Sequence, residues 1–432
     1  MKIHYTHFYL YILILLITIG CDRKKIEQEK FPAEELIADI NEMFRMLEQT
    51  HPDLYSYTSR DDIYKRKSKI KESINTPLTR VEFYKLITPL VTSLGDAHTG
   101  IHPYLKEVNR YRNEGGLFFP FDIFIRNGSI FVLENYSNKG KIEPGSEILS
   151  INGYQSYDII QTMLQYTYGD RDAIRYEIIA RHYFPILLWL LYGLDTEFNV
   201  RYQCPVSGTI KQEIIEGESY AVFSQKRPEP RDNFTFSHIP EKKTGIIELR
   251  NMRGRTEFEA FLKNTFNKLK DEEVEHLIID ISNNGGGDPT MGEMLWYYIT
   301  EIPYQSHSYS SINKENNNKV LRFNGEVYLI TGRLTYSSAI QFAANFKDHR
   351  IGTILGEETG GLATFFSRTA HFTLPRTELE GIVSSYKIIR PSGIDDGRGV
   401  LPDIEVIADV DDIINGRNPA LDYTLNLIKD KK

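Results

Sequence analysis

The chain has 432 residues, 41% of them apolar, which is enough to bury a sizeable core in two or three domains. Its formal net charge of −8 disfavours nucleic acid as the main partner, since phosphate binding needs a basic face. The sequence contains no basic stripe and no zinc-type cluster of cysteine and histidine.

The N-terminus is typical of an export signal. An apolar run over residues 8–20 is too short for a comfortable transmembrane helix, and Cys21 follows it as at a bacterial lipoprotein cleavage site. The usual pattern prefers Leu where Thr18 stands, so an uncleaved anchor or a plain signal peptide stays open. We expect a signal peptide over 1–20, a lipid on Cys21 and a charged tether over 21–30. The protein would then be anchored in the bacterial cell envelope, facing the periplasm or the cell surface.

Residues 31–113 are predicted to form an N-terminal helical domain. Apolar residues recur there at helical spacing in two stretches. The second stretch begins with Thr79 as a plausible N-cap and Glu82 as its capping-box partner. The glycine-bounded turn GDAHTG, residues 95–100, ends the helical pattern.

Residues 114–167 follow the two-residue period of strands. Two strands are expected around an Asn-Gly turn, and GSEILSING at 145–153 predicts a short hairpin before a helix. This order resembles a PDZ module, in which an extended peptide binds by β-addition. The carboxylate-binding loop of such a module would be formed by Gly116, Leu117, Phe118 and Phe119. The alternative is a β-rich spacer that binds no ligand.

The rest of the chain divides into a poorly patterned part and a regular one. Residues 168–243 are interpreted as a β-rich connecting part of the core, and the apolar run 186–194 is expected to be buried or to line an apolar pocket. From 244 to 428 strands and helices alternate. This alternation predicts an α/β domain with a largely parallel sheet and helices packed on it.

Two loops of the regular part carry candidate chemistry. NNGGG follows a buried strand and places Gly285, Gly286 and Gly287 where backbone amides can face a ligand. In TYSSA, Ser337 opens a helix after a strand and a tight turn, which is how many hydrolases present a nucleophile. The Ser338 amide and the positive end of that helix would stabilise an oxyanion. The alternative is that Ser337 only caps the helix.

A serine hydroxyl needs a general base to become a nucleophile. His98 differs from the other histidines because it lies in the compact turn GDAHTG, where Asp96 and Thr99 could hold its ring by hydrogen bonds. A purely structural role for His98 in this turn is the alternative.

Six motifs, in order along the chain, resemble those of the C-terminal-processing (tail-specific) and tricorn-like serine peptidases. They are GDAHTG, GSEILSING, LIIDISNNGGG, TYSSA, LGEETGG and GRGVLPDIEV. The resemblance implies a ClpP/crotonase-like catalytic core with a PDZ module and a helical cap. It also implies Ser337 as the nucleophile, His98 as the base, and Gly286 with the Ser338 amide as the oxyanion hole. No metal or organic cofactor is implied.

The resemblance also implies an acid that orients the base. That acid is expected just upstream of the PDI motif, where Asp396 is the first choice and Asp395 the alternate. Glu357 and Glu358, in LGEETGG, are further alternatives near the expected site.

The sequence departs from the tail-specific pattern at the position of the catalytic lysine, where Leu362 stands. A Ser–His–acid arrangement therefore fits better, and Lys387 could take part only if the fold brings it to the site. The expected activity is hydrolysis of peptide bonds in exported polypeptides, internally or at their C-termini. The alternative is a catalytically inactive lipoprotein of the same fold that binds peptide or lipid.

Overall fold

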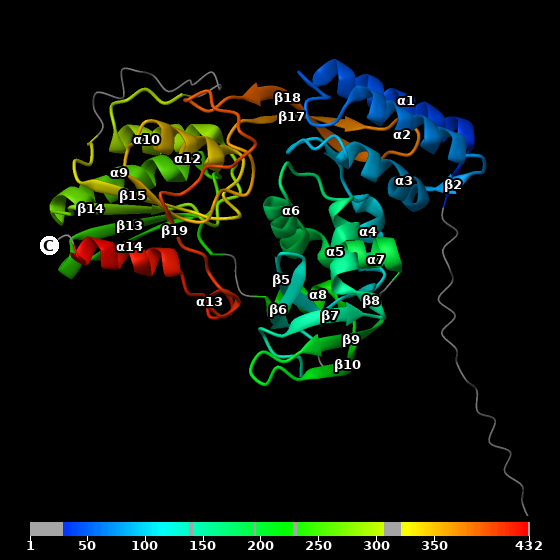
Figure 1. Ribbon diagram of the computed structural model, residues 1–432, viewed down its shortest axis with the longest axis horizontal. Coiled ribbons are helices and arrows are strands. Elements are labelled where there is room, and N and C mark those ends of the chain that lie inside the picture. Colours follow the sequence, from blue (N-terminus) through cyan, green and yellow to red (C-terminus); the bar gives the residue numbers. More distant parts are fainter. Residues whose placement is uncertain (1–28, 138–140, 194–195, 228–230, 306–320, 431–432) are drawn as a thin grey trace, which may run out of the picture.

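The computed structural model describes residues 29–137, 141–193, 196–227, 231–305 and 321–430. The predicted signal peptide and Cys21 lie outside these ranges. Among the helices described, none is both long and apolar enough to cross a membrane. Figure 1 shows a layered core, a helical cap and a β-rich module, and two long strands that join the core to the cap. The mixed α/β class expected from the sequence is confirmed.

The core is built on a six-stranded sheet of order β12-β13-β14-β15-β16-β19. These strands are Phe234–Ile239, Thr244–Leu249, His276–Asp280, Glu326–Thr331, Thr353–Gly356 and Ile404–Glu405. β12 pairs with β13 in antiparallel fashion, and the pairs from β13 to β19 are parallel. The predicted parallel sheet is therefore confirmed.

Helices cover both faces of this sheet (Figure 1). They are α9 (Arg255–Asp271), α10 (Pro289–Ile299), α12 (Ser338–Asp348) and α14 (Pro419–Asp430). Successive side chains of a strand point to opposite faces, so Leu277 and Ile279 join the cluster beneath α9, α10 and α12. Ile278 joins the smaller cluster under α14. Both faces are buried, which is why β14 has the continuous apolar sequence LII.

The cap comprises four helices, and a capping box at Thr79 and Glu82 opens the third, as predicted. Its elements are β1 (Lys30–Phe31), α1 (Ala33–Thr50), α2 (Arg60–Ser73), β2 (Leu78–Thr79), α3 (Arg80–Thr92), β3 (Gly100–Ile101) and α4 (Leu105–Asn113). The long strands β17 (Phe365–Thr373) and β18 (Glu380–Ile388) form a sheet with β3. Phe365 of β17 packs in the core cluster, and Phe372 of the same strand packs in the cap cluster. The two strands therefore connect the cap, which contains the loop of His98, with the core.

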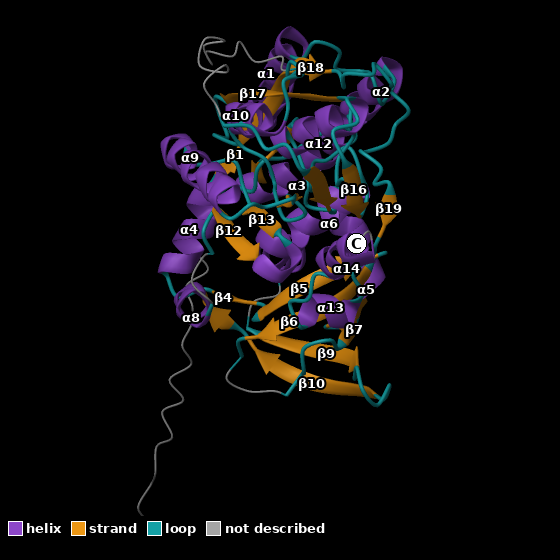
Figure 2. Cartoon of the chain, turned by 90° about the vertical axis from the view of Figure 1, so that its left-hand side faces the viewer, coloured by secondary structure: helices purple, strands orange, loops and turns teal. Residues whose placement is uncertain are grey.

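The module contains a sheet of order β10-β9-β7-β6-β5, which Figure 2 shows with β10 at its outer edge. Its strands are β5 (Phe121–Arg126), β6 (Ser129–Asn135), β7 (Glu147–Ile151), β8 (Tyr154–Gln155), β9 (Glu197–Gln203) and β10 (Ile210–Glu216). Helices pack on it: α5 (Ser156–Leu164), α6 (Asp172–Ile178), the π-helix η1 (Ile179–Tyr183) and α7 (Phe184–Tyr192). Smaller elements are β4 (Leu117–Phe118), β11 (Glu218–Ser219), α8 (Tyr220–Lys226), the 3-10 helix η2 (Pro240–Lys242) and α13 (Val410–Ile414).

The assignment of residues 168–243 to the core is largely wrong. β9 pairs with β7, and its alternate residues Phe198 and Val200 are buried in the module cluster, so most of this stretch completes the module. Among the strands that the structure describes in this stretch, only β12 enters the core sheet. The apolar run 186–194 is mainly helix α7, and its buried side chains pack against the module and the cap, as expected of a buried segment.

Candidate active site

Ser337 stands between β15 and α12, where the chain turns sharply. Its backbone has φ 55° and ψ −122°, a conformation that side-chain-bearing residues rarely adopt and that is typical of functional turns. Thr335 fixes the turn, because its Oγ1 donates to the Ile281 carbonyl at 2.8 Å and accepts from the Gly332 amide at 3.0 Å. The Ser337 side chain makes no capping hydrogen bond to α12. The structure therefore argues against Ser337 as a mere helix cap.

His98 lies against Ser337 although 239 positions separate them in the chain. Its Nε2 is 3.2 Å from Ser337 Oγ, and its Nδ1 is 2.8 Å from the carbonyl oxygen of Phe366. A carbonyl can only accept, so Nδ1 carries the proton and Nε2 faces the hydroxyl as an acceptor. The Tyr336 ring stacks on the imidazole at 5.1 Å with an interplanar angle of 11°. This arrangement is that of a base beside a nucleophile.

The environment keeps His98 neutral. Burial lowers the pKa of His98 below its ordinary value of 6.5, and the nearby Asp96 carboxylate opposes this effect only in part. Neutral imidazole therefore predominates at neutral pH, as a general base requires.

Asp96 does not hold the His98 ring directly, contrary to the sequence expectation. Its Oδ2 instead accepts hydrogen bonds from Thr99 Oγ1, from Ser384 Oγ at 2.7 Å and from His51 Nε2 at 3.3 Å. Asp96 is thus part of a buried network just behind the histidine.

The two predicted oxyanion donors lie next to each other. A Cβ added to Gly286 would stand 2.8 Å from Ser337 Cβ and 3.0 Å from the Ser338 nitrogen, so this close approach requires glycine. Ser338 is the first residue of α12, and its amide therefore has no intrahelical partner. The Gly286 amide, however, donates to Asn284 Oδ1 at 2.8 Å. An oxyanion would have to compete with Asn284 for this second donor.

The printed contacts of the predicted orienting acid do not include His98. Asp396 is exposed, and its Oδ1 accepts from the Arg398 amide at 3.1 Å. The alternate, Asp395, accepts from Lys387 Nζ at 3.3 Å. The physical reason is that a backbone carbonyl of β17, at Phe366, already occupies His98 Nδ1.

The two glutamates of LGEETGG are also engaged elsewhere. Glu357 accepts from Arg126 at 3.0 Å, and Glu358 accepts from Arg398 and is 2.7 Å from an Arg171 nitrogen. Both therefore pair with arginines, and their described contacts do not include His98.

The position of the missing lysine is part of the core. Leu362 is buried there, and its amide donates to Asp170 Oδ2 at 3.2 Å. The Lys387 side chain is partly exposed, and its Nζ lies 5.5 Å from the centre of the Phe366 ring while pairing with Asp395. The described contacts of Lys387 therefore do not include Ser337.

The predicted carboxylate-binding loop at 116–119 is covered, which corrects its assignment. The Gly116 amide donates to the Tyr111 carbonyl at 2.8 Å, and the Leu117 amide donates to Tyr111 Oη at 3.1 Å. Leu117 and Phe118 pair with β11, and Phe118 and Phe119 are buried. The amides that would grip a peptide carboxylate are used inside the protein.

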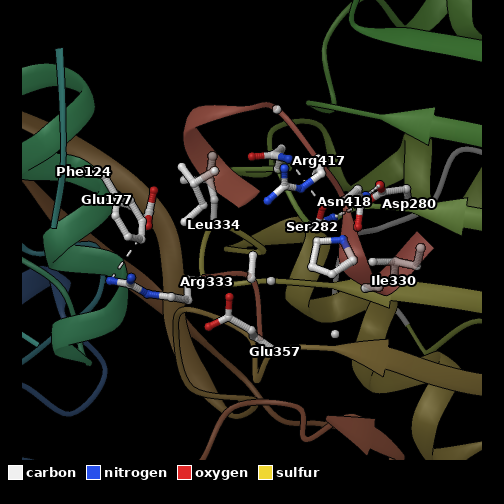
Figure 3. A pocket seen from close by; sticks show the side chains of 18 of the residues that line it. Phe124, Glu177, Asp280, Ser282, Ile330, Arg333, Leu334, Glu357, Arg417 and Asn418 are labelled. Atoms are coloured by element: carbon white, nitrogen blue, oxygen red, sulfur yellow. Dashed lines mark hydrogen bonds and ion pairs between the residues drawn. The ribbon is translucent and has the colours of Figure 1, made fainter. Parts of the chain in front are cut away.

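A cavity of about 680 Å³ lies between the module and the core, and Figure 3 shows side chains that line it from each of the two parts. Arg126 pairs with Glu357 at 3.0 Å across it, while Arg333 lies 3.8 Å from Glu177 and donates to the Ile125 carbonyl at 3.0 Å. Neither Ser337 nor His98 is among the described residues that line this cavity.

Two contributions to the site were not predicted. The Phe366 carbonyl has no sequence signal, since every residue carries one. The Tyr336 ring could have been suspected from the aromatic residue that precedes the serine in TYSSA, and its hydroxyl donates to the Ala97 carbonyl at 2.5 Å.

Comparison with known proteins points to a family of peptidases. Residues 243–406 match the model of peptidase family S41. Over 135 residues the chain is 30% identical to the tail-specific protease of Haemophilus influenzae, a stretch that covers 30% of this chain and 19% of that protein. The resemblance to the C-terminal-processing serine peptidases is confirmed for this part of the chain, which is similar to peptidase family S41.

The fold is also similar to that of solved structures. Mature CPAF complexed with lactacystin has a TM-score of 0.64 at 11% identity, covering 92% of this chain and 98% of that one. A second structure of mature CPAF has a TM-score of 0.61 at 11% identity, covering 91% and 96% of the two chains. At such low identity these likenesses concern the fold alone.

Proposed function

We propose that the protein is a serine peptidase in which Ser337 is the nucleophile and His98 the general base. The observation that carries the proposal is the 3.2 Å approach of His98 Nε2 to Ser337 Oγ, on a strained turn at the start of a helix. The match of residues 243–406 to the model of peptidase family S41 supports the same reaction class.

The reaction would be acyl transfer to water. His98 Nε2 takes the Ser337 proton while Oγ attacks the peptide carbonyl, and the Phe366 carbonyl keeps the other ring nitrogen protonated. The Ser338 amide and the positive end of α12 stabilise the oxyanion, and the Gly286 amide adds to this if it turns away from Asn284. His98 then protonates the leaving amine, and water hydrolyses the acyl-enzyme.

The substrates would be exported polypeptides, cut internally or near their C-termini. A lipid on Cys21 would hold the enzyme to a membrane of the bacterial cell envelope. The module, interpreted as PDZ-like, would bind substrate; because its 116–119 loop is covered, we assign this role to the cavity beside edge strand β5. The core sheet with helices on both faces supports a ClpP/crotonase-like domain.

A fluorophosphonate probe tests the proposal on the full chain. Wild-type protein should be labelled at Ser337, located by peptide mass analysis, and Ser337→Ala and His98→Ala should lose labelling. Lys387→Ala is the matched control, because this side chain pairs with Asp395 rather than with the serine, and it should label like wild type. Labelling at another serine, or full labelling of His98→Ala, would reject the assignment.

A second candidate is an inactive binding protein of the same fold. The hydrogen bond from the Gly286 amide to Asn284 favours it, since the oxyanion hole is then only half available. Absence of labelling in a folded wild-type protein that still binds peptide or lipid would establish this alternative.

A further inference from the structure

Asp96 is a buried carboxylate that the mechanism above does not use. It lies two residues before His98 on the loop 95–100 and is only 3% exposed. Burying a carboxylate is costly unless it is hydrogen-bonded, so its retention beside the base calls for a physical explanation.

The hydrogen bonds of Asp96 are concentrated on one oxygen. Oδ2 accepts from Thr99, Ser384 and His51, and these bonds keep the carboxylate charged by lowering its pKa despite burial. His51 donates through Nε2 because its Nδ1 accepts from the Asp53 amide at 3.1 Å. Oδ1 is buried without a hydrogen-bond partner in the described part of the chain. The negative charge is therefore fixed in position and poorly screened.

The same network ties the His98 loop to the strands that orient its ring. Ser384 belongs to β18, and its amide also donates to Thr99 Oγ1 at 3.1 Å. The His51 ring packs on the Phe366 ring at 4.5 Å, and Phe366 supplies the carbonyl that holds His98 Nδ1. Asp96 thus connects the loop before His98 with both β17 and β18.

We propose that Asp96 is the acidic positioning residue of this active site, stabilising the charged form of His98 through space and holding its loop against β17. The inference rests on the proposed function of Ser337 and His98. It explains how a base whose second nitrogen meets only a neutral carbonyl can still accept a proton in a buried site. The charge acts without direct contact, because electrostatic attraction is strong where water is excluded.

Three further titratable groups lie close enough to Asp96 to affect a pH measurement. Asp170, Tyr57 and Tyr336 all interact electrostatically with Asp96, and burial raises the pKa of Asp170 to about 7. Near neutral pH, the Asp170 carboxyl therefore exchanges its own proton, and the phenols stay neutral. Of these groups, Asp96 should change the pKa of His98 most when it loses its charge, because it exerts the largest electrostatic effect on that histidine.

The decisive experiment compares Asp96→Asn with Ser384→Ala in the full chain. Asp96→Asn removes the charge while keeping the size and hydrogen-bonding capacity, whereas Ser384→Ala removes one hydrogen bond and keeps the charge. The His98 titration is followed by NMR of ring-labelled histidine and assigned with His98→Gln, and the labelling rate of Ser337 by a fluorophosphonate is followed against pH.

For Asp96→Asn we expect the proton affinity of His98 to fall about tenfold or more, since the stabilising negative charge is gone. The acid limb of labelling should move to lower pH, and the plateau rate should fall roughly tenfold to hundredfold. Ser384→Ala should leave the His98 titration in place. Asp96→Ser, which leaves a hydroxyl for the network, is the second charge-removing variant if Asp96→Asn does not fold.

An unmoved His98 titration in the folded charge-removing variant would overturn the proposal, as would an equal shift in Ser384→Ala. Failure of the proposed function is a separate result, because an unlabelled wild type leaves the NMR titration of His98 measurable. A shifted titration in an unlabelled protein would assign Asp96 its electrostatic effect and reject only the peptidase chemistry.

Discussion

Two sites of this molecule were expected to bind an oxygen anion through backbone amides, the oxyanion hole beside Ser337 and the loop 116–119, and only the first keeps an amide open to do so. At the start of α12 the Ser338 amide has no intrahelical partner, and His98 stands across from Ser337. At residues 116–119 the amides of Gly116 and Leu117 donate to Tyr111 instead. A glycine-containing motif therefore predicts an anion site only when the surrounding fold leaves its amides without an internal partner.

The largest effect should follow from removing the proposed catalytic pair. Ser337→Ala and His98→Ala should each lower kcat/KM for a peptide substrate by roughly 10⁴-fold or more, because nucleophile and base act as a unit. The double variant should be no worse than either single one, which a steady-state comparison would check. Additive losses would mean that the two residues act independently, and the contrast between the two sites would lose its basis.

A methyl group at Gly286, on the loop that faces Ser337, tests the oxyanion hole next. Gly286 has φ 92°, and an added Cβ would meet the Tyr336 carbonyl oxygen at 2.7 Å. Gly286→Ala should therefore displace the oxyanion hole and lower kcat by about 10²–10³-fold, with a loss of about 1–3 kcal/mol in stability. Gly285→Ala is the matched control, since a Cβ there has no neighbour within 4 Å, and its kcat should be close to wild type. Equal kcat values for the two variants would contradict this reading.

The pH dependence gives a smaller, graded effect. Burial lowers the pKa of His98 below 6.5, so the base should stay neutral and active at mildly acidic pH. Below that pKa, His98 binds a proton and cannot accept another, and kcat/KM should fall about tenfold for each further pH unit. A pH profile of kcat/KM measures the inflection. An acid limb centred above 6.5 would conflict with the buried environment of His98.

The smallest effect is expected at the covered loop. Tyr111→Phe removes a hydroxyl that accepts from the Leu117 amide and donates to the Leu117 carbonyl at 2.9 Å. The loss should cost about 2 kcal/mol in the free energy of unfolding, by the usual value of two hydrogen bonds. The KM for peptides ending in a free carboxylate should stay within about twofold, since the loop remains covered by β11. Urea unfolding and peptide kinetics measure the two quantities. A marked fall in KM would restore residues 116–119 as a peptide site.

Most of the predicted site depended on local patterns, which the structure brings together. The strands that precede Gly286 and Ser337 are neighbours in a parallel sheet, and the ends of such strands meet at one edge. Because the turn conformation and the helix start at Ser337 are local, TYSSA was enough to place them. His98 was selected by its compact glycine-bounded turn and by family resemblance, and the structure confirms that it reaches Ser337.

The remaining features depended on contacts that no local pattern contains. The partner of His98 Nδ1 is a backbone carbonyl, which has no sequence signature, so the search for an acid led to the exposed Asp396 instead. Strand β9, with its partner β10, belongs to the module because Phe198 and Val200 pack in the module's buried cluster. The alternation of apolar and polar residues predicts a strand but does not say which sheet the strand belongs to. The sequence by itself determined the parallel core, the helical cap and the serine–histidine pair. Tertiary structure decided which amides stay open and which carboxylate lies near the base, because both depend on neighbours that are distant in the chain.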